Sequence, residues 1–113
     1  MNKIEKSLEL FLEAKQLMPG GVNSPVRAFK NIKSNPIFFK SAKGPFLYDV
    51  DDNKYIDYIG SWGPMIMGHS HEKIIEAVKR QVELGTSYGA PTGLETDVAK
   101  LIKQAVPSIE KIR

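Results

Sequence analysis

Residues 36–57 have the sequence PIFFKSAKGPFLYDVDDNKYID, and this stretch decides the fold class. It contains three short runs of aromatic and branched residues, which are typical of β-strands. The first two runs, residues 37–39 and 46–48, flank a turn signal at 41–45, where glycine and proline are adjacent. Two aspartates and an asparagine form a second turn signal before the run at 55–57. The pattern predicts a small antiparallel meander.

Helices are predicted on both sides of the meander. Apolar residues recur at helical spacing over residues 3–18, and the Pro-Gly-Gly at 19–21 ends that pattern. Ser70 is a suitable N-cap for a helix that continues to Leu84. Residues 92–95, Thr-Gly-Leu-Glu, match a capping box before a third helix. The stripes that we expect to be buried are Ile74, Ile75, Val78 and Val82, then Val98, Leu101, Ile102 and Ala105.

The predicted fold class is α/β, as an α+β arrangement of an N-terminal helix, the meander and two further helices. Residues 22–35 and 60–64 have no regular period, and long irregular segments of this kind inside compact enzymes are often functional. Ile109 and Ile112 begin a strand-like pattern, and Arg113 follows it with no turn or cap. We therefore expect residues 1–113 to be one domain segment that is incomplete at its C-terminal end.

Composition excludes several function classes. The chain has 113 residues, of which 42% are hydrophobic and 26% charged, as in ordinary soluble proteins. Its net charge of +3 includes no basic run, so we expect no nucleic-acid partner. The absence of cysteine excludes disulfides and agrees with a cytoplasmic location. Acidic residues interrupt the N-terminal apolar stretch, and no apolar run reaches the roughly 20 residues that span a bilayer, so we expect no membrane association.

His69 and His71 flank Ser70, and the sequence around them suggests two candidate sites, a metal site and a catalytic triad. A metal site would need a third ligand, for which Glu72 is the obvious neighbour. Two histidines at this spacing are more often one packed and one solvated side chain, so we predict no metal site. A Ser-His-Asp triad of Ser70, His69 and Asp57 lacks the nucleophile-elbow sequence that such a serine requires.

Arg27 and Trp62 lie in the two irregular segments. Arg27 follows glycines and prolines that let a backbone approach a ligand, and its guanidinium fits a carboxylate with two parallel hydrogen bonds. Taken alone, an arginine on a loop is more often a surface charge. Trp62, the only tryptophan, is flanked by glycine-rich sequence and is by itself more often a core residue than a pocket wall. Composition and spacing therefore predict no particular reaction.

Three blocks of sequence carry a family resemblance. Residues 19–29, PGGVNSPVRAF, resemble the opening signature of glutamate-1-semialdehyde aminomutases, a branch of the class III pyridoxal-phosphate aminotransferases. Residues 55–64, YIDYIGSWGP, with the Gly-His at 68–69, and residues 85–91, GTSYGAP, agree in order and spacing. The hairpin and the Gly-His pair are shared across class III, whereas the VNSPVR segment separates the aminomutases from their relatives. The resemblance covers essentially the whole chain.

The resemblance implies a fold-type-I enzyme that is a cytoplasmic homodimer with pyridoxal 5'-phosphate as cofactor. Its small-molecule substrate would be glutamate-1-semialdehyde, converted to 5-aminolevulinate in tetrapyrrole (porphyrin) biosynthesis. By matching position, Ser24, Arg27 and Trp62 would bind the substrate, with Arg27 holding a carboxylate.

The departures from the family pattern are also informative. The family's Schiff-base lysine, its phosphate-binding turn and the acid that pairs with the pyridine nitrogen would all lie beyond Arg113. The resemblance therefore assigns no catalytic and no cofactor-binding residue to this stretch, and we expect it to be inactive alone. Two alternatives stay open: another class III aminotransferase that uses ornithine or a diamine, and a non-catalytic binding module. Residues 20–29 argue against the first, and a cooperative thermal melt would favour the second.

Overall fold

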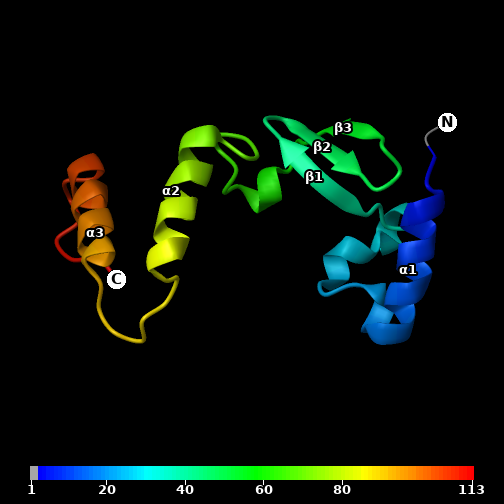
Figure 1. Cartoon of the computed structure of the whole chain (residues 1–113), viewed down its shortest axis with the longest axis horizontal. Coiled ribbons are helices and arrows are strands. Elements are labelled where there is room, and N and C mark those ends of the chain that lie inside the picture. Colours follow the sequence, from blue (N-terminus) through cyan, green and yellow to red (C-terminus); the bar gives the residue numbers. More distant parts are fainter. Residues whose placement is uncertain (1–2) are drawn as a thin grey trace. The chain divides into compact units, whose positions relative to one another are not determined.

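The computed structural model describes residues 3–113, which form two compact units that meet between Ile75 and Glu76. The elements of the first unit are, in chain order, α1 (Glu5–Leu17), the 3₁₀ turns η1 (Pro19–Gly21), η2 (Pro25–Ala28) and η3 (Lys30–Ile32), strands β1 (Phe39–Lys43), β2 (Phe46–Asp49) and β3 (Lys54–Ile56), and the turn η4 (Gly60–Trp62). Helix α2 (Glu72–Leu84) continues into the second unit, which also contains α3 (Gly93–Ala105) (Figure 1). None of the helices described is long and apolar enough to cross a membrane.

The three strands form an antiparallel sheet in the order β1-β2-β3, which confirms the predicted meander. Lys43 pairs with Phe46, so the first turn contains only Gly44 and Pro45. The first strand therefore lies later than the predicted run at 37–39, because the glycine-proline pair alone makes the turn. Gly44 has φ +55°, a left-handed conformation that a residue without Cβ adopts at no steric cost.

Helix α1 is attached to the sheet through the turn between β2 and β3. The backbone amides of Lys6 and Ser7 donate hydrogen bonds to the carboxylate of Asp51 at 2.8 and 3.0 Å. The first amides of a helix have no partner within the helix, so Asp51 caps α1 from 45 residues along the chain. The hydroxyl of Ser7 also accepts a bond from the Phe38 amide at 3.3 Å, just before β1. Contacts between distant segments thus fix the start of α1.

A buried carboxylate organises the same turn from inside. Asp49 is 0% exposed and accepts hydrogen bonds from the Asn53 side chain at 2.7 Å and from the Tyr55 hydroxyl at 2.9 Å. It also accepts bonds from the backbone amides of Asp51 and Asn53. Burial acts to raise the pKa of Asp49, but these hydrogen bonds outweigh it and the net pKa lies below the usual value. The carboxylate is therefore ionised at neutral pH and holds the turn that presents Asp51.

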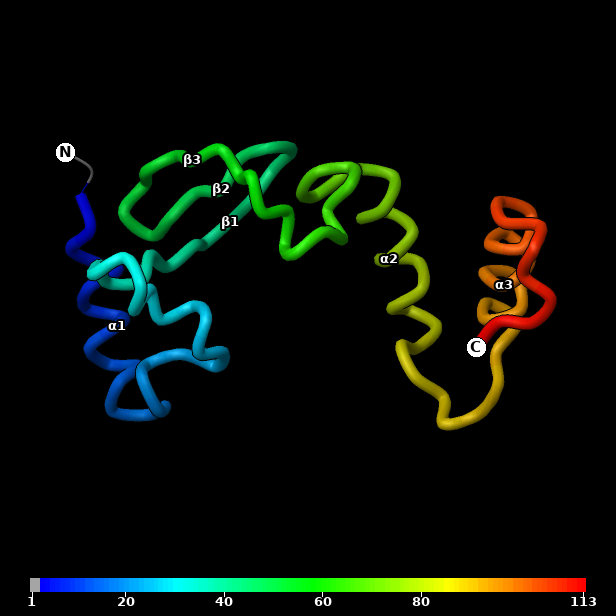
Figure 2. Tube along the Cα trace, turned by 180° about the vertical axis from the view of Figure 1, so that it is seen from behind, coloured from blue at the N-terminus to red at the C-terminus, as the bar shows by residue number. Residues whose placement is uncertain are grey.

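The irregular segment after α1 folds back beside that helix (Figure 2). Gly21 is buried with φ +71°, and a Cβ at this position would lie 2.7 Å from Cε2 of Phe11. Phe11 and Ala14 of α1 are buried, as is Ala28 at the end of η2. This packing places the neighbouring Arg27 at the surface of the first unit.

The predicted N-cap of α2 is wrong. Ser70 has φ +51°, and its hydroxyl donates to the carbonyl of Ala42 in β1 at 2.9 Å. The helix begins at Glu72, and the carbonyl of His71 accepts the first helical bond, from the Ile75 amide at 3.0 Å. Ser70 is a poor cap here because its side chain is engaged with the sheet.

Helix α3 begins as its sequence predicts, since the Glu95 carboxylate accepts the return bond of the capping box from the Thr92 amide at 3.4 Å. The strand expected at residues 109–112 is wrong, because this segment is irregular and the Ile109 amide closes a turn onto the Val106 carbonyl. The apolar stripes of α2 and α3 are exposed or half-buried. Helical periodicity identifies such a stripe but does not specify the element that covers it.

Candidate functional site

Arg27 and Trp62, two of the three residues expected from the family resemblance, line the same cavity in the first unit. The cavity has a volume of about 620 Å³, within the range of small-molecule sites. Its walls are mainly apolar and aromatic, and its lining residues are Arg27, Phe29, Ile37, Phe39, Leu47, Tyr55, Ile56, Asp57, Tyr58, Ile59, Ser61, Trp62 and His69. Ser24, the third expected residue, is not among them.

The Arg27 guanidinium has no hydrogen-bond or ion-pair partner within residues 3–113. Asp57 is the acid that lines this cavity, and its carboxylate is bonded elsewhere. The backbone of Arg27 is fixed within its turn, because its amide donates a hydrogen bond to the carbonyl of Ser24 at 2.9 Å. Ser24 therefore supports the turn that carries Arg27. The cavity presents one free cationic fork, which suits a carboxylate or another small anion.

Trp62 sits in a strained turn. Gly60, Ser61, Trp62 and Gly63 all have positive φ, of 57°, 54°, 68° and 111°. A left-handed conformation costs a residue with a Cβ about 1–2 kcal/mol, so Ser61 and Trp62 are both held against their preference. The indole is 73% exposed in the described chain. Strain that persists at an exposed aromatic residue indicates that surrounding contacts impose the conformation.

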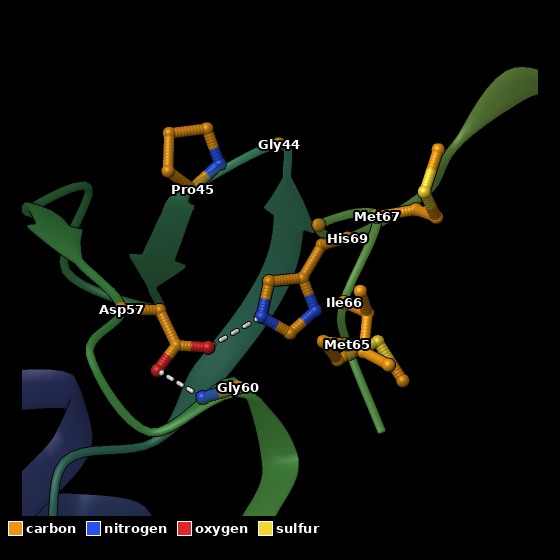
Figure 3. Close-up of a pocket in the computed structure, with 9 residues that line it drawn as sticks. Gly44, Pro45, Asp57, Gly60, Met65, Ile66, Met67 and His69 are labelled. Carbon is orange, nitrogen blue, oxygen red and sulfur yellow. Dashed lines mark hydrogen bonds and ion pairs between the residues drawn. The ribbon is translucent and has the colours of Figure 1, made fainter. Parts of the chain in front are cut away.

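Asp57 and His69 form a largely buried, hydrogen-bonded pair beside this turn (Figure 3). His69 Nε2 lies 2.6 Å from Asp57 Oδ2, and the two side chains are 14% and 7% exposed. The bond from His69 is the largest cause that lowers the pKa of the Asp57 carboxyl, followed by bonds from the amides of Gly60 and Ile59, while burial acts in the opposite direction. Because the carboxylate is ionised at neutral pH, it can only accept, and His69 Nε2 carries the shared proton.

A second, smaller cavity of about 380 Å³ is also lined by Asp57 and His69. Figure 3 shows Met65, Ile66 and Met67 around it, with His69 pointing toward Asp57. Asp57 and His69 therefore line both of these cavities of the first unit, of which the larger is also lined by Arg27 and Trp62.

The alternative chemistries at the histidines are not assembled. Within residues 3–113, no group of three or more histidine, cysteine, aspartate or glutamate side chains could hold a metal ion. Of the Ser70-His69-Asp57 triad, the hydrogen bond between Asp57 and His69 is present. The hydroxyl of Ser70, however, donates to the Ala42 carbonyl and makes no bond to His69. An activated nucleophile requires that bond to its base.

Residues 3–113 do not hold pyridoxal phosphate by themselves. No lysine lines the cavity that contains Arg27, so among residues 3–113 its walls offer no amine for an aldehyde group. Among residues 3–113, the side chain at this cavity that can bind an anion with two parallel hydrogen bonds is that of Arg27.

The second unit has a separate cavity of about 530 Å³ at the segment between α2 and α3. Gln81 holds this segment by donating from Nε2 to the Gly85 carbonyl and to the Tyr88 hydroxyl, both at 3.1 Å. The Tyr88 hydroxyl in turn donates to the Leu84 carbonyl at 3.0 Å. These bonds hold the GTSYGAP block in a defined, irregular conformation.

Comparison with a solved structure and with a protein family identifies the class of protein to which this chain belongs. A solved transaminase with PLP bound superposes on 96% of this chain with a TM-score of 0.86 and 32% sequence identity, and this chain covers 25% of it. The fold is that of part of a transaminase. The family described as Aminotransferase class-III matches residues 28–113, and the chain belongs to this family.

Two curated relatives are similar to this chain at higher sequence identity. Glutamate-1-semialdehyde 2,1-aminomutase of Heliobacterium modesticaldum is 59% identical over 109 residues, which are 96% of this chain and 25% of that protein. The protein of the same name in Thermodesulfovibrio yellowstonii is 58% identical over 111 residues, which are 98% of this chain and 26% of that protein. The chain thus spans about a quarter of the length of these relatives.

The family resemblance named Arg27 and Trp62 as candidates, and the triad considered from the sequence paired Asp57 with His69 only as catalytic partners; the bonds from Asp57 to the turn at Gly60 were missed. Asp57 precedes a glycine by three residues, which is typical of a carboxylate that caps a turn, and this spacing could have indicated its role. No local signal joins it to His69, because their contact depends on how the chain returns to the sheet.

Proposed function

We propose that this chain is the N-terminal segment of a glutamate-1-semialdehyde 2,1-aminomutase, and that it supplies the substrate side of the active site. The observation that carries the proposal is the cavity shared by an unpaired Arg27 and Trp62. The identity of 58–59% to proteins of that name supports it. The full-length enzyme would convert glutamate-1-semialdehyde to 5-aminolevulinate in tetrapyrrole biosynthesis, and residues 1–113 alone would be inactive.

Arg27 binds the carboxylate of the substrate. That carboxylate lies away from the carbons that exchange the amino group, so anchoring it sets which carbon is presented for reaction. A guanidinium provides two parallel hydrogen bonds, whereas an ammonium supplies charge without the planar fork. Ser24 assists by holding the turn before Arg27, through its carbonyl at 2.9 Å from the Arg27 amide.

Trp62 and the neighbouring aromatic residues exclude water around the bound carboxylate. Phe39 and Tyr55 pack edge to face on this wall, with ring centroids 5.7 Å apart. Reduced access of water strengthens the interaction between Arg27 and an anion, since the local dielectric falls.

The cofactor of the full-length protein is pyridoxal 5'-phosphate, in keeping with membership of the class III family. When bound, it supplies the electron sink for amino transfer, and the residues of this chain bind and orient the substrate beside it. We also propose a cytoplasmic homodimer. An amino-donor screen of the full-length protein separates this function from that of a class III aminotransferase acting on ornithine or a diamine.

The test of the substrate side is substitution of Arg27 in the full-length protein. Arg27→Lys should lower kcat/KM for glutamate-1-semialdehyde, and Arg27→Ala should lower it further. A charged hydrogen bond is worth roughly 1.5–3 kcal/mol, so the expected loss is about ten- to a hundredfold. Steady-state kinetics at low substrate concentration measure it.

Arg80→Ala is the matched control, because Arg80 is an exposed arginine on α2. It should leave kcat/KM unchanged. Absorbance of the bound cofactor should be the same in all variants, since Arg27 is assigned to the substrate alone. Turnover of Arg27→Ala equal to that of the unmodified protein would show that Arg27 is only a surface charge.

A further inference from the structure

We infer that Asp57 and His69 are positioning residues that hold the left-handed turn of Trp62 at the cavity it shares with Arg27. The proposed function enters only through the substrate used in the kinetic test below. The positioning role of Asp57 and His69 rests on the geometry of the turn, of their hydrogen-bonded pair and of the sheet.

The turn needs support from outside because its backbone is unfavourable. Its own bonds run from the Trp62 amide to the Ile59 carbonyl and from the Gly63 amide to the Gly60 carbonyl, both at 3.1 Å. Bonds of this type also form in right-handed turns, so they do not by themselves select the left-handed conformation of Ser61 and Trp62.

Asp57 supplies the first part of that support. Its Oδ1 accepts hydrogen bonds from the amides of Ile59 and Gly60 at 2.8 and 3.0 Å, immediately before Ser61. These two bonds fix the direction in which the chain enters the turn. The Asp57 amide donates to the Pro45 carbonyl at 2.8 Å, so the carboxylate is itself attached to the turn between β1 and β2.

His69 supplies the second part, from the segment that follows the turn. Its backbone pairs with Gly44 through two hydrogen bonds of 2.9 Å. The contact is close, since a Cβ on Gly68 would lie 3.0 Å from the Gly44 carbonyl oxygen. His69 thus reaches Asp57 from a fixed backbone, and Figure 3 shows the dashed contacts that join His69, Asp57 and Gly60 in series.

The pair therefore closes a loop around Trp62. The chain leaves the sheet at Asp57, makes the strained turn and returns at His69, and the hydrogen bond between the Asp57 and His69 side chains joins the two ends. Loss of this bond removes the side-chain link that orients the turn, while the backbone bonds of Asp57 to Pro45 and of His69 to Gly44, and those of the sheet, remain.

The test uses the fluorescence of Trp62 in the full-length protein, with any tryptophan outside residues 1–113 replaced by phenylalanine, so that the signal reports on this turn without substrate. Time-resolved anisotropy separates fast local motion of the indole from tumbling of the protein. His69→Ala and Asp57→Ala should increase the amplitude of the fast component. His69→Gln should restore it toward the original value, because the Gln Nε2 can still donate to Asp57.

His71→Ala is the matched control. His71 lies two residues away, and its Nδ1 is buried without a hydrogen-bond partner in the described part of the chain. This variant should leave the fast component unchanged. If His69→Ala loses its far-ultraviolet circular dichroism, His69→Leu refills the space without a donor and should show the same increase. Unchanged anisotropy in folded His69→Ala or His69→Leu would overturn the inference.

Kinetics of the full-length protein separate this inference from the proposed function. Misplacement of a binding group by about 1 Å can cost about a hundredfold, so His69→Ala should lower kcat/KM by about ten- to a hundredfold and His69→Gln should recover most of it. A mobile Trp62 with undiminished kcat/KM would support the positioning role and contradict Trp62 as a substrate residue. Lost activity with an immobile Trp62 would overturn the positioning role, because His69 would then act directly.

Discussion

Single residues in this chain are constrained mainly by backbone conformation and close contact. Gly21 shows both constraints, since it has φ +71° and its missing Cβ would overlap Phe11 and Cγ of Lys15 at 2.7 and 2.9 Å. Gly20 has nearly the same backbone, φ +70°, with no atom within 4 Å of its missing Cβ. A comparison of Gly20 with Gly21 therefore distinguishes the free-energy cost of a left-handed backbone from the cost of steric overlap.

Gly21→Ala should destabilise the protein more than Gly20→Ala. The left-handed backbone costs each variant about 1–2 kcal/mol, and overlap with α1 adds to this only at position 21. Urea denaturation measures the free energy of unfolding of both variants and of the original protein. Equal losses would mean that α1 moves away from the segment at no cost.

Elements are joined by carboxylates in the turn between β2 and β3. Burial acts to raise the pKa of Asp51, but hydrogen bonds from the amides of Lys6 and Ser7 and from the Ser7 side chain lower it below its usual value. Asp49 is shifted in the same direction, as described above. The attachment of α1 to the sheet therefore depends on ionised carboxylates.

The melting temperature should fall as the pH is lowered below about 4. A carboxyl whose pKa is lowered in the folded state binds protons more readily when unfolded, so its stabilisation is complete above the unfolded pKa and is lost as the pH falls through the folded pKa. Circular dichroism melts between pH 7 and pH 2.5 measure this dependence.

Asp51→Asn tests the cause of that pH dependence. This variant should be less stable at pH 7 and should lose less stability on acidification, because one shifted carboxyl is absent. Asp97→Asn is the control, since Asp97 makes only an exposed pair with Lys100 on α3. Equal pH dependence in the original and the Asp51→Asn protein would exclude Asp51 as a contributor.

At the scale of the whole molecule, apolar helix faces lie open. Ile74, Val78 and Val82 of α2 are between 49% and 56% exposed, and Leu101 of α3 is 64% exposed. Contiguous exposed apolar faces mark surfaces that another element or chain covers.

Residues 1–113 in isolation should self-associate through these faces. Light scattering at micromolar concentration should give a mass above that of the monomer. The double variant Val78→Lys with Val82→Lys should shift the mass toward the monomer, because it places charge within the stripe of α2. Glu83→Lys adds the same two units of positive charge outside the stripe and should have little effect. A monomeric original chain would contradict the prediction.

The sequence by itself determined the elements of this protein and its family. The meander, the end of α1 before Pro19 and the capping box of α3 follow from periodicity and turn chemistry, which act over a few residues. The resemblance of whole blocks of sequence identified the class III family and named Arg27 and Trp62 as candidates, because short motifs keep their residue types and spacing.

Only the tertiary structure decided how these pieces meet. The cap of α1 by Asp51, the use of Ser70 on the sheet, the Asp57–His69 pair and the shared cavity of Arg27 and Trp62 all join residues far apart in the chain. Such contacts form when loops close, and the closure depends on the packing of many residues at once. Local spacing carries no record of which distant partner a polar side chain will find.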